Sequence, residues 1–344
     1  MKKVALIIIV TTLFAACNKD FKITTEWEEQ MIVYGLIDVR SPVQYLKITK
    51  AFLGDDKIIK YSENPDSSQY NTPLDVKMYE LDENGNILQT FTFDTIHIHT
   101  KDSGLFYSPT QIAYKSRPYD PFYIEEIYPQ NDTIYDTACL NPNHKYRLEV
   151  KNTKSGMSIT SETNLADFSF FEKPSYYSAL LPFSIFDNTS GYNFEWTNGN
   201  HSNIAQFKLY FEYGEKKYGS IDTIYKKIKI TDDVIVGKSE YKVLSDVFLS
   251  TCDKLIKYDD SELEDSIEKR FIGNCLLELH IGNEVLYKYM MVNKPSSGLI
   301  QDKPIYTNIH DGIGIFGSRT KINYKGTLVG AIVTALKDDL NLNF

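Results

Sequence analysis

Leu74-Asp-Val-Lys-Met-Tyr-Glu-Leu81, Asp82-Glu-Asn-Gly-Asn86 and Ile87-Leu-Gln-Thr-Phe-Thr-Phe93 follow one another directly along the chain. The first of these runs alternates apolar and polar side chains with a period of two, which is the pattern of a strand that buries one face. Asn84 and Gly85 both tolerate a positive φ, and this pair is the strongest short-range signal for a hairpin turn. The stretch therefore predicts two antiparallel strands joined by a tight turn.

More strand-length runs flank this hairpin, and turn residues separate them. They cover residues 31–38, 44–50, 104–107, 145–150 and 158–163. The aromatic residues are 25 Tyr and 19 Phe against 2 Trp, a bias that favours strands. We expect a mostly β protein, with an immunoglobulin-like β-sandwich domain over residues 28–165.

A second β domain is predicted over residues 166–344, since 344 residues suffice for two ordinary domains. Residues 192–196 and 205–213 resemble two core strands of a fibronectin type III sandwich. Residues 239–256 place apolar side chains at helical spacing after a serine, so we expect one short amphipathic helix there. Residues 275–281 and 285–292 predict a last hairpin around Gly282-Asn283.

The first residues of the chain have the features of an export signal. Lys2 and Lys3 precede an apolar stretch over residues 4–16 that is short for a membrane-spanning helix. Leu13-Phe-Ala-Ala-Cys17 resembles the lipobox of bacterial lipoproteins, in which the cysteine is acylated before cleavage. We therefore expect a signal peptide over residues 1–16, a lipidated Cys17, and a polar tether over residues 17–27.

The formal charge of the chain is -9. An acidic body does not attract nucleic acid or anionic lipid by its overall charge, so neither is expected as an electrostatic partner of the whole molecule. The expected membrane contact is the acyl group on Cys17, because each buried methylene contributes about 0.8 kcal/mol to membrane binding.

A proline-containing segment over residues 109–138 fits the strand pattern poorly, and we interpret it as an excursion over the surface. The candidate ligand-binding side chains are four tyrosines of this segment, because exposed amphipathic rings serve both glycan platforms and protein interfaces. They are Tyr114, Tyr119, Tyr123 and Tyr128. Packing of these rings within a sheet is the alternative.

The sequence gives little support for catalytic or metal chemistry. It contains no Gly-x-Ser-x-Gly elbow and no His-Glu-x-x-His motif, and no paired histidine accompanies a cysteine in a familiar context. His97 and His99 would share one face of a strand, but no further ligand follows at a recognisable spacing. No cofactor and no metal are therefore expected. A Cys252–Cys275 disulfide is one prediction, and buried free thiols, as for Cys139, are the alternative.

Pro304-Ile-Tyr-Thr-Asn-Ile-His-Asp-Gly-Ile-Gly-Ile-Phe-Gly317 is similar to the carboxy-terminal signature of the Bacteroidetes lipoprotein family of the domain of unknown function 4249 type. The lipobox and the opening run Ile32-Val-Tyr-Gly-Leu-Ile37 agree with that family. The resemblance implies an outer-membrane location and an accessory role beside TonB-dependent transporters, with no established activity. Read physically, Gly312, Gly314 and Gly317 predict a tight bend or bulge where a closing strand re-enters a sheet.

These observations together predict a non-catalytic binding or scaffold protein, lipid-anchored in the cell outer membrane and facing the periplasm or the surface, as an accessory to a TonB-dependent uptake system. A surface glycan-binding or nutrient-binding lipoprotein is the first alternative. A hydrolase with a site that the linear sequence does not reveal is the second alternative.

Overall fold

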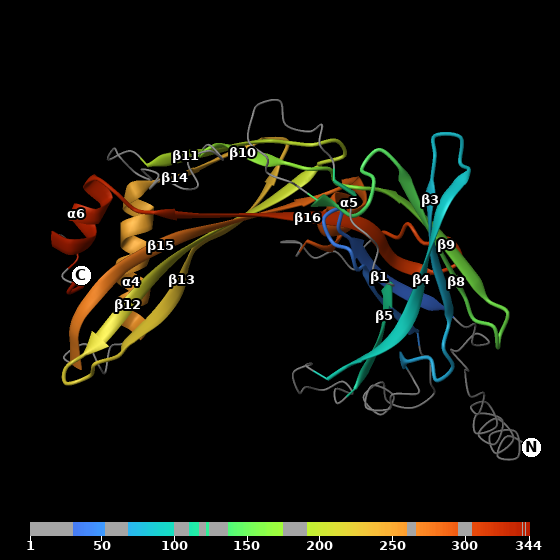
Figure 1. Cartoon of the computed structure of the whole chain (residues 1–344), viewed down its shortest axis with the longest axis horizontal. Helices are drawn as coiled ribbons and strands as arrows, with labels where there is room; N and C mark the ends of the chain where they lie inside the picture. Colours follow the sequence, from blue (N-terminus) through green and yellow to red (C-terminus); the bar gives the residue numbers. More distant parts are fainter. Residues whose placement is uncertain are drawn as a thin grey trace, which may run out of the picture.

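The computed structural model describes residues 30–51, 68–99, 110–116, 122–123, 137–174, 191–259, 266–294, 305–338, 340 and 342–344. The fold is mostly β, with a sheet of 11 strands, a sheet of 3 strands and a sheet of 2 strands. Figure 1 shows two halves, joined by the long strand β16 (Ile313–Thr327). Among the described residues, no helix has both the length and the apolar character to cross a membrane.

The predicted hairpin is confirmed as β3 (Asp75–Leu81) and β4 (Ile87–Ile98), which pair antiparallel. Gly85 adopts a φ of 82° in the turn. One carboxylate oxygen of Asp82 accepts the backbone N–H groups of Asn84 at 2.9 Å and Asn86 at 2.8 Å. This side chain therefore satisfies the turn's own donors, which is why the sequence signal was reliable.

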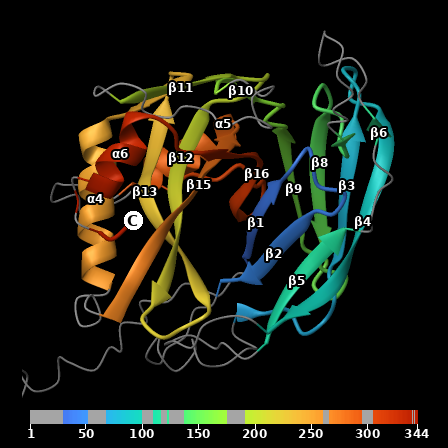
Figure 2. The ribbon, with the colours of Figure 1, turned by 60° about the vertical axis from the view of Figure 1, so that its left-hand side comes forward.

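The first half is a sheet that curls around one hydrophobic core (Figure 2). Its strands run in the spatial order β16, β1, β2, β5, β4, β3, β8 and β9. The remaining bounds are β1 (Met31–Ile37), β2 (Tyr45–Lys50), β5 (Gln111–Ser116), β8 (Lys145–Lys151) and β9 (Ser158–Asn164). The inward side chains, such as Val33, Met78, Leu148 and Phe316, form the core, as the period-two pattern requires.

A short segment before β16 closes this curled sheet by bridging β9 to β16. The backbone N–H of His310 donates to Thr160 O at 2.8 Å, and Ser161 Oγ donates to Asn308 O at 2.7 Å. On the other side, the Asn308 amide donates to Phe316 O at 2.8 Å and accepts the Phe316 N–H at 3.0 Å. The side chain of Asn308 thus pairs with β16 as the backbone of a neighbouring strand would.

The second half is a two-layered body with its own core. The far ends of the 11-stranded sheet form one layer, with β13 (Thr223–Val236), β12 (Ile204–Lys217), β15 (Ile267–Gly282) and β16. The other layer contains β10 (Phe170–Lys173), β11 (Tyr192–Thr197), β14 (Glu240–Val243), α4 (Ser245–Asp259) and α6 (Ala331–Asp338). Trp196, Phe207 and Phe248 are buried between the layers.

The two halves are continuous through β16, which contributes Phe316 to the first core and Tyr324 to the second. Its first part pairs parallel with β1, from Ile32↔Ile313 to Ile37↔Ser318. Gly314 has a φ of 112°, and a Cβ at this position would lie 2.0 Å from Val33 O. The bend or bulge predicted for the glycine run is not seen at this residue, because the pairing with β1 runs through Gly314 without a register shift; the glycine instead permits the close approach of the two backbones.

The structure does not show the two separate sandwiches expected from the sequence. The described strands form one sheet through both halves, because β1 and β16 pair although they come from opposite ends of the chain. Of the fibronectin-like pair, β11 lies in the 3-stranded sheet and β12 in the 11-stranded one, and Trp196 of β11 stacks against Phe207 of β12.

Two further local predictions were wrong, and the predicted helix of the second half is confirmed with a later start. Residues 111–116 are not a surface excursion but the sheet strand β5, between β2 and β4. Residues 285–292 are not a strand but the body of helix α5 (Glu284–Asn293), and α6 was not anticipated. The predicted helix at 239–256 begins later, at Ser245, because residues 240–243 form β14. Phe122–Tyr123 and Thr137–Ala138 pair as β6 and β7.

Candidate functional site: a polar groove where the halves meet

Asn283 forms the centre of the contact between the two halves and is almost fully buried. Its amide nitrogen donates to Thr163 Oγ1 at 2.8 Å and to Asn164 O at 2.7 Å, both on β9. Its amide oxygen accepts the backbone N–H groups of Leu286 and Ser318, each at 3.2 Å. One side chain therefore connects β9, the first turn of α5 and β16, and every polar atom of its amide is used.

Beside Asn283 lies an open groove of about 600 Å³ with walls from both halves. The first half contributes β8 and β9, and the second half contributes the loop before β12 and the start of α5. The lining residues are Lys145, Glu162, Thr163, Asn164, Gly199, Asn200, His201, Ser202, Asn203, Asn283, Glu284 and Val285. Almost all of them present amide, hydroxyl or charged groups, so the groove suits a polar ligand or a polar segment of a partner.

Two smaller hollows continue this groove in opposite directions. One of about 390 Å³ shares Lys145, Glu162 and Asn164 with it and reaches the turn between β3 and β4. The other, of about 300 Å³, shares Ser202 and Asn203 and reaches the end of β13. Ser202 Oγ is buried there and has no hydrogen-bond partner among the described residues. Since buried hydroxyls are almost always paired, this one is available to a bound ligand or water.

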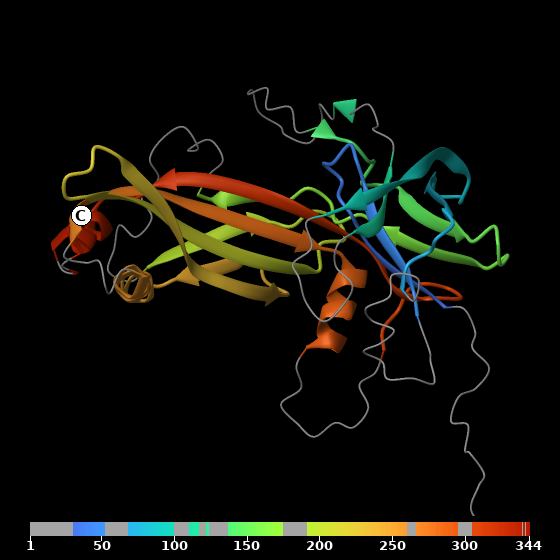
Figure 3. The same ribbon diagram turned by 90° about the horizontal axis from the view of Figure 1, so that it is seen from below.

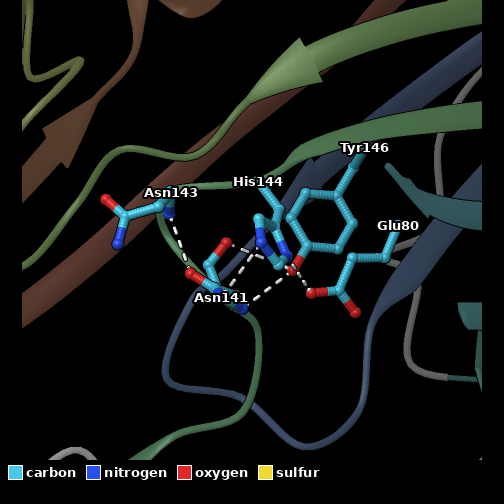
Figure 4. Close-up of polar contacts among 5 residues, drawn as sticks. All are labelled: Glu80, Asn141, Asn143, His144 and Tyr146. Carbon is cyan, nitrogen blue, oxygen red and sulfur yellow. Dashed lines mark hydrogen bonds and ion pairs between the residues drawn. The ribbon is translucent and has the colours of Figure 1, made fainter. Parts of the chain in front are cut away.

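Next to Lys145, between β3 and the start of β8, lies a carboxylate and imidazole pair (Figure 4). His144 Nδ1 lies 2.7 Å from the buried carboxylate of Glu80, and His144 Nε2 lies 3.4 Å from the Asn141 amide nitrogen. Tyr146 Oη accepts the Asn141 N–H at 2.8 Å, and the Asn143 N–H donates to Asn141 Oδ1 at 3.0 Å. These bonds hold the turn from Asn141 to His144 against β3.

A Glu–His pair is also the arrangement that orients a general base in many hydrolases. A general base needs one ring nitrogen directed at the substrate. Here the first ring nitrogen of His144 faces Glu80 and the second faces Asn141, so both contacts serve the turn. The geometry of this pair favours a positioning role for the turn that carries Lys145 into the groove and Asn143 into the hollow of about 390 Å³ beside it.

Of the four tyrosines singled out from the sequence, the structure describes the side chain of Tyr114. Tyr114 is buried in the first core, and burial raises the pKa of its hydroxyl. Tyr119, Tyr128 and the side chain of Tyr123 lie outside the described residues, as does Cys17. The ring of Tyr114 is therefore a packing element, which was the alternative interpretation for this segment.

The three described cysteines are free and buried. Cys252 on α4 and Cys275 on β15 belong to the same core, and burial raises the pKa of both thiols well above the usual range. Each is therefore held as the unreactive neutral thiol. The disulfide between them stays a prediction.

His97 and His99 are exposed, near the end of β4, and the part of the chain that the structure describes holds no group of three or more potential metal-ligating His, Cys, Asp or Glu side chains. The groove residues were missed because they come from four separate parts of the chain. The one available signal was Asn283 before Glu284, which is the pattern of a helix N-cap.

A comparison of the chain with protein-family models finds no match, and none of the curated proteins matches it. The resemblance to the lipoprotein family with the carboxy-terminal signature therefore stays a prediction.

Proposed function

We propose that this chain is a lipid-anchored protein of the cell envelope that acts by binding, as a scaffold or accessory partner of an outer-membrane TonB-dependent uptake system. The observation that carries the proposal is the polar groove, whose two walls are fixed to each other by the buried Asn283. A site whose walls are already positioned loses little conformational entropy when a partner binds. The lipobox at Cys17 supports the location, and the carboxy-terminal resemblance supports the partner class.

A second candidate function is direct capture of a glycan or another polar nutrient. The groove favours it through its asparagines Asn164, Asn200 and Asn203, since an amide both donates and accepts hydrogen bonds, as a sugar hydroxyl does. In that case the ligand would occupy the groove that the first proposal assigns to a protein segment.

The test is a mild-detergent pull-down of the tagged chain from its native envelope, with co-purifying proteins identified by mass spectrometry. Three variants accompany it: Cys17→Ala, the groove variant Asn200→Ala with Asn203→Ala, and the matched variant Asn293→Ala, which changes an asparagine outside the groove lining. We expect a transporter in stoichiometric amount with the wild type and with Asn293→Ala, and loss of it with the groove variant.

Recovery of the tagged chain alone would overturn the accessory role. Glycan-binding measurements on the same wild-type and groove variants would then decide the second candidate. Equal recovery of a transporter with the groove variant would show that the partner binds elsewhere and would overturn the assignment of the groove.

A further inference from the structure

The turn between β12 and β13 exposes an unusual amount of apolar surface at the end of the second half that is distant from β3 and β8 (Figure 1). Ile221 is 95% exposed, Tyr225 is 79% exposed and Tyr218 is 69% exposed. Ile224 and Phe271 are also among the exposed large hydrophobic residues. Such a concentration of exposed apolar side chains in one place usually marks a contact surface.

This tip is held in shape by the sheet behind it. Tyr218 N donates to Ser266 O at 3.0 Å, which ties the turn to the start of β15. Tyr225, Gly214 and Phe271 lie in register across three strands. A Cβ on Gly214 would lie 3.4 Å from the Tyr225 ring, so this ring rests over the glycine. The exposed rings are therefore presented by paired strands rather than by a free loop.

Lysines flank the strands behind the apolar apex. They are Lys216, Lys217, Lys226, Lys227 and Lys269. Two of them form ion pairs, Lys216 with Glu268 and Lys226 with Glu215, each at 2.9 Å. Lys269 Nζ lies 5.4 Å from the centre of the Phe271 ring, and Lys227 Nζ lies 4.6 Å from that of Tyr210. Lys217, Lys227 and Lys269 stand against Asp222, so the described residues of the tip have a small positive excess in a chain whose formal charge is -9.

The shape and layering of the tip favour one kind of partner. A standard protein interface draws on about 20–30 residues from each side. The tip offers the five exposed apolar residues named above. The tip has an isoleucine at its apex, tyrosines behind it and lysines further back. This order matches a membrane interface, where apolar side chains lie deepest, amphipathic rings lie at the headgroups and lysines reach anionic phosphates. We propose that the β12–β13 turn inserts into the headgroup region of a bilayer that contains anionic lipid.

The inference is independent of acylation at Cys17 and of the groove, so its failure leaves the proposed function standing. The test uses the full chain with Cys17→Ala and Ile221→Cys, labelled with an environment-sensitive fluorophore. The three remaining cysteines are buried and do not compete for the label. The matched control is Leu88→Cys in the same background, since Leu88 is 52% exposed on a hairpin of the other half. Any contribution of residues 4–16 to vesicle binding is common to both proteins.

The labelled proteins are mixed with vesicles of phosphatidylcholine alone or with added phosphatidylglycerol. We expect a blue shift of the fluorophore at position 221 with the anionic vesicles, and none at position 88. The sequence has four acidic residues at 260–265, and their charge opposes binding to anionic lipid. The difference between the two kinds of vesicle includes this opposing effect. No shift at 221, an equal shift at 88, or an equal shift with neutral vesicles would overturn the proposal.

Charge reversal supplies the second measurement. Lys227→Glu with Lys269→Glu should weaken binding to anionic vesicles more than about tenfold, because each lysine near such a surface contributes about 1 kcal/mol. Lys154→Glu with Lys294→Glu makes the same change of net charge at exposed positions away from the tip. Equal weakening by both pairs would assign the effect to overall charge and would also overturn the proposal.

Discussion

The side chain of Arg270 on β15 is fully buried, and it donates hydrogen bonds to a carboxylate and to a backbone carbonyl. Its Nε donates to Glu215 Oε1 at 2.8 Å and its Nη1 donates to Leu342 O at 2.8 Å. Lys226 lies 2.9 Å from the second carboxylate oxygen of Glu215. The backbone N–H of Arg270 donates to Asn343 O at 2.7 Å. The guanidinium therefore holds the last residues of the chain against the second core.

Arg270→Met should lower the free energy of unfolding by about 3–5 kcal/mol, because a buried carboxylate loses its fully buried partner. The measurement is urea unfolding followed by circular dichroism. Lys288→Met is the matched control, since Lys288 pairs with Glu284 on the surface of α5 and such pairs contribute about 0.5 kcal/mol. Equal losses from the two variants would contradict the structural role of Arg270.

His280 on β15 predicts a pH dependence of stability. Burial lowers the pKa of its imidazole below the usual 6.5, and Arg319, Lys208 and Lys321 add to this effect, while the hydrogen bond to Glu278 opposes it. A base with a lowered pKa binds protons less well in the folded chain than in the unfolded chain. Its contribution to stability is present above pH 6.5 and is lost as the pH falls below that value toward the lowered pKa.

His280→Gln should therefore flatten the change in unfolding free energy between about pH 7.5 and about pH 5. Urea unfolding at a series of pH values measures this change in the unfolding free energy. His97→Gln removes an exposed imidazole from β4 and should leave the wild-type profile unchanged. A His280→Gln profile as steep as that of the wild type would assign the pH dependence to other groups.

At the scale of elements, the joint between the halves depends on how closely β1 and β16 approach each other. Gly314→Ala would place a methyl group 2.0 Å from Val33 O in a backbone with a φ of 112°. We expect a loss of at least about 2 kcal/mol in the free energy of unfolding, from the combined clash and strain. Thermal or urea unfolding measures this loss.

Gly85→Ala separates the cost of the steric clash from the cost of the backbone strain. Gly85 also has a positive φ, of 82°, but no atom lies within 4 Å of the position of its missing Cβ. This variant should lose only about 1 kcal/mol, the cost of the backbone conformation alone. If both alanine variants lost the same free energy of unfolding, the close approach of β1 and β16 would not account for the loss in Gly314→Ala.

Helix α5 shows what the period-two rule could not predict. Residues 285–292 are apolar enough to resemble a strand after Gly282-Asn283, yet they begin a helix because Asn283 accepts the Leu286 N–H as its N-cap. Hydrophobic pattern alone does not separate a short strand from a short helix, and the cap decides. The same amide also binds β9, a contact that no local pattern contains.

Asn283→Ala tests this joint directly. The variant loses two donated and two accepted hydrogen bonds in a buried place, so we expect the free energy of unfolding to fall by about 2–4 kcal/mol. Urea unfolding measures the fall. Asn293→Ala at the other end of α5 removes one exposed bond to Tyr289 O and should cost less than about 1 kcal/mol. Equal costs would contradict a joint centred on Asn283.

For the whole molecule, the sequence predicted the β class and the first hairpin, because both depend on neighbouring residues. It did not predict the 11-stranded sheet, since the pairing of β1 with β16 joins residues such as Ile32 and Ile313 from distant parts of the chain. The groove was hidden for the same reason. Its walls are held together by long-range contacts, such as the hydrogen bonds of Asn308 to β16 and of Asn283 to β9.

The parallel pairing of β1 with β16 also determines how the molecule bears mechanical load. When the amino-terminal side of β1 and the carboxy-terminal side of β16 are pulled apart, the two parallel strands must slide along each other. Their row of hydrogen bonds is then loaded together, in shear, rather than opened one bond at a time. If the chain is held at its amino-terminal end and pulled through the far half, the pairing of β1 with β16 would therefore need a high force to break. Until it breaks, it would transmit the tension from one half to the other.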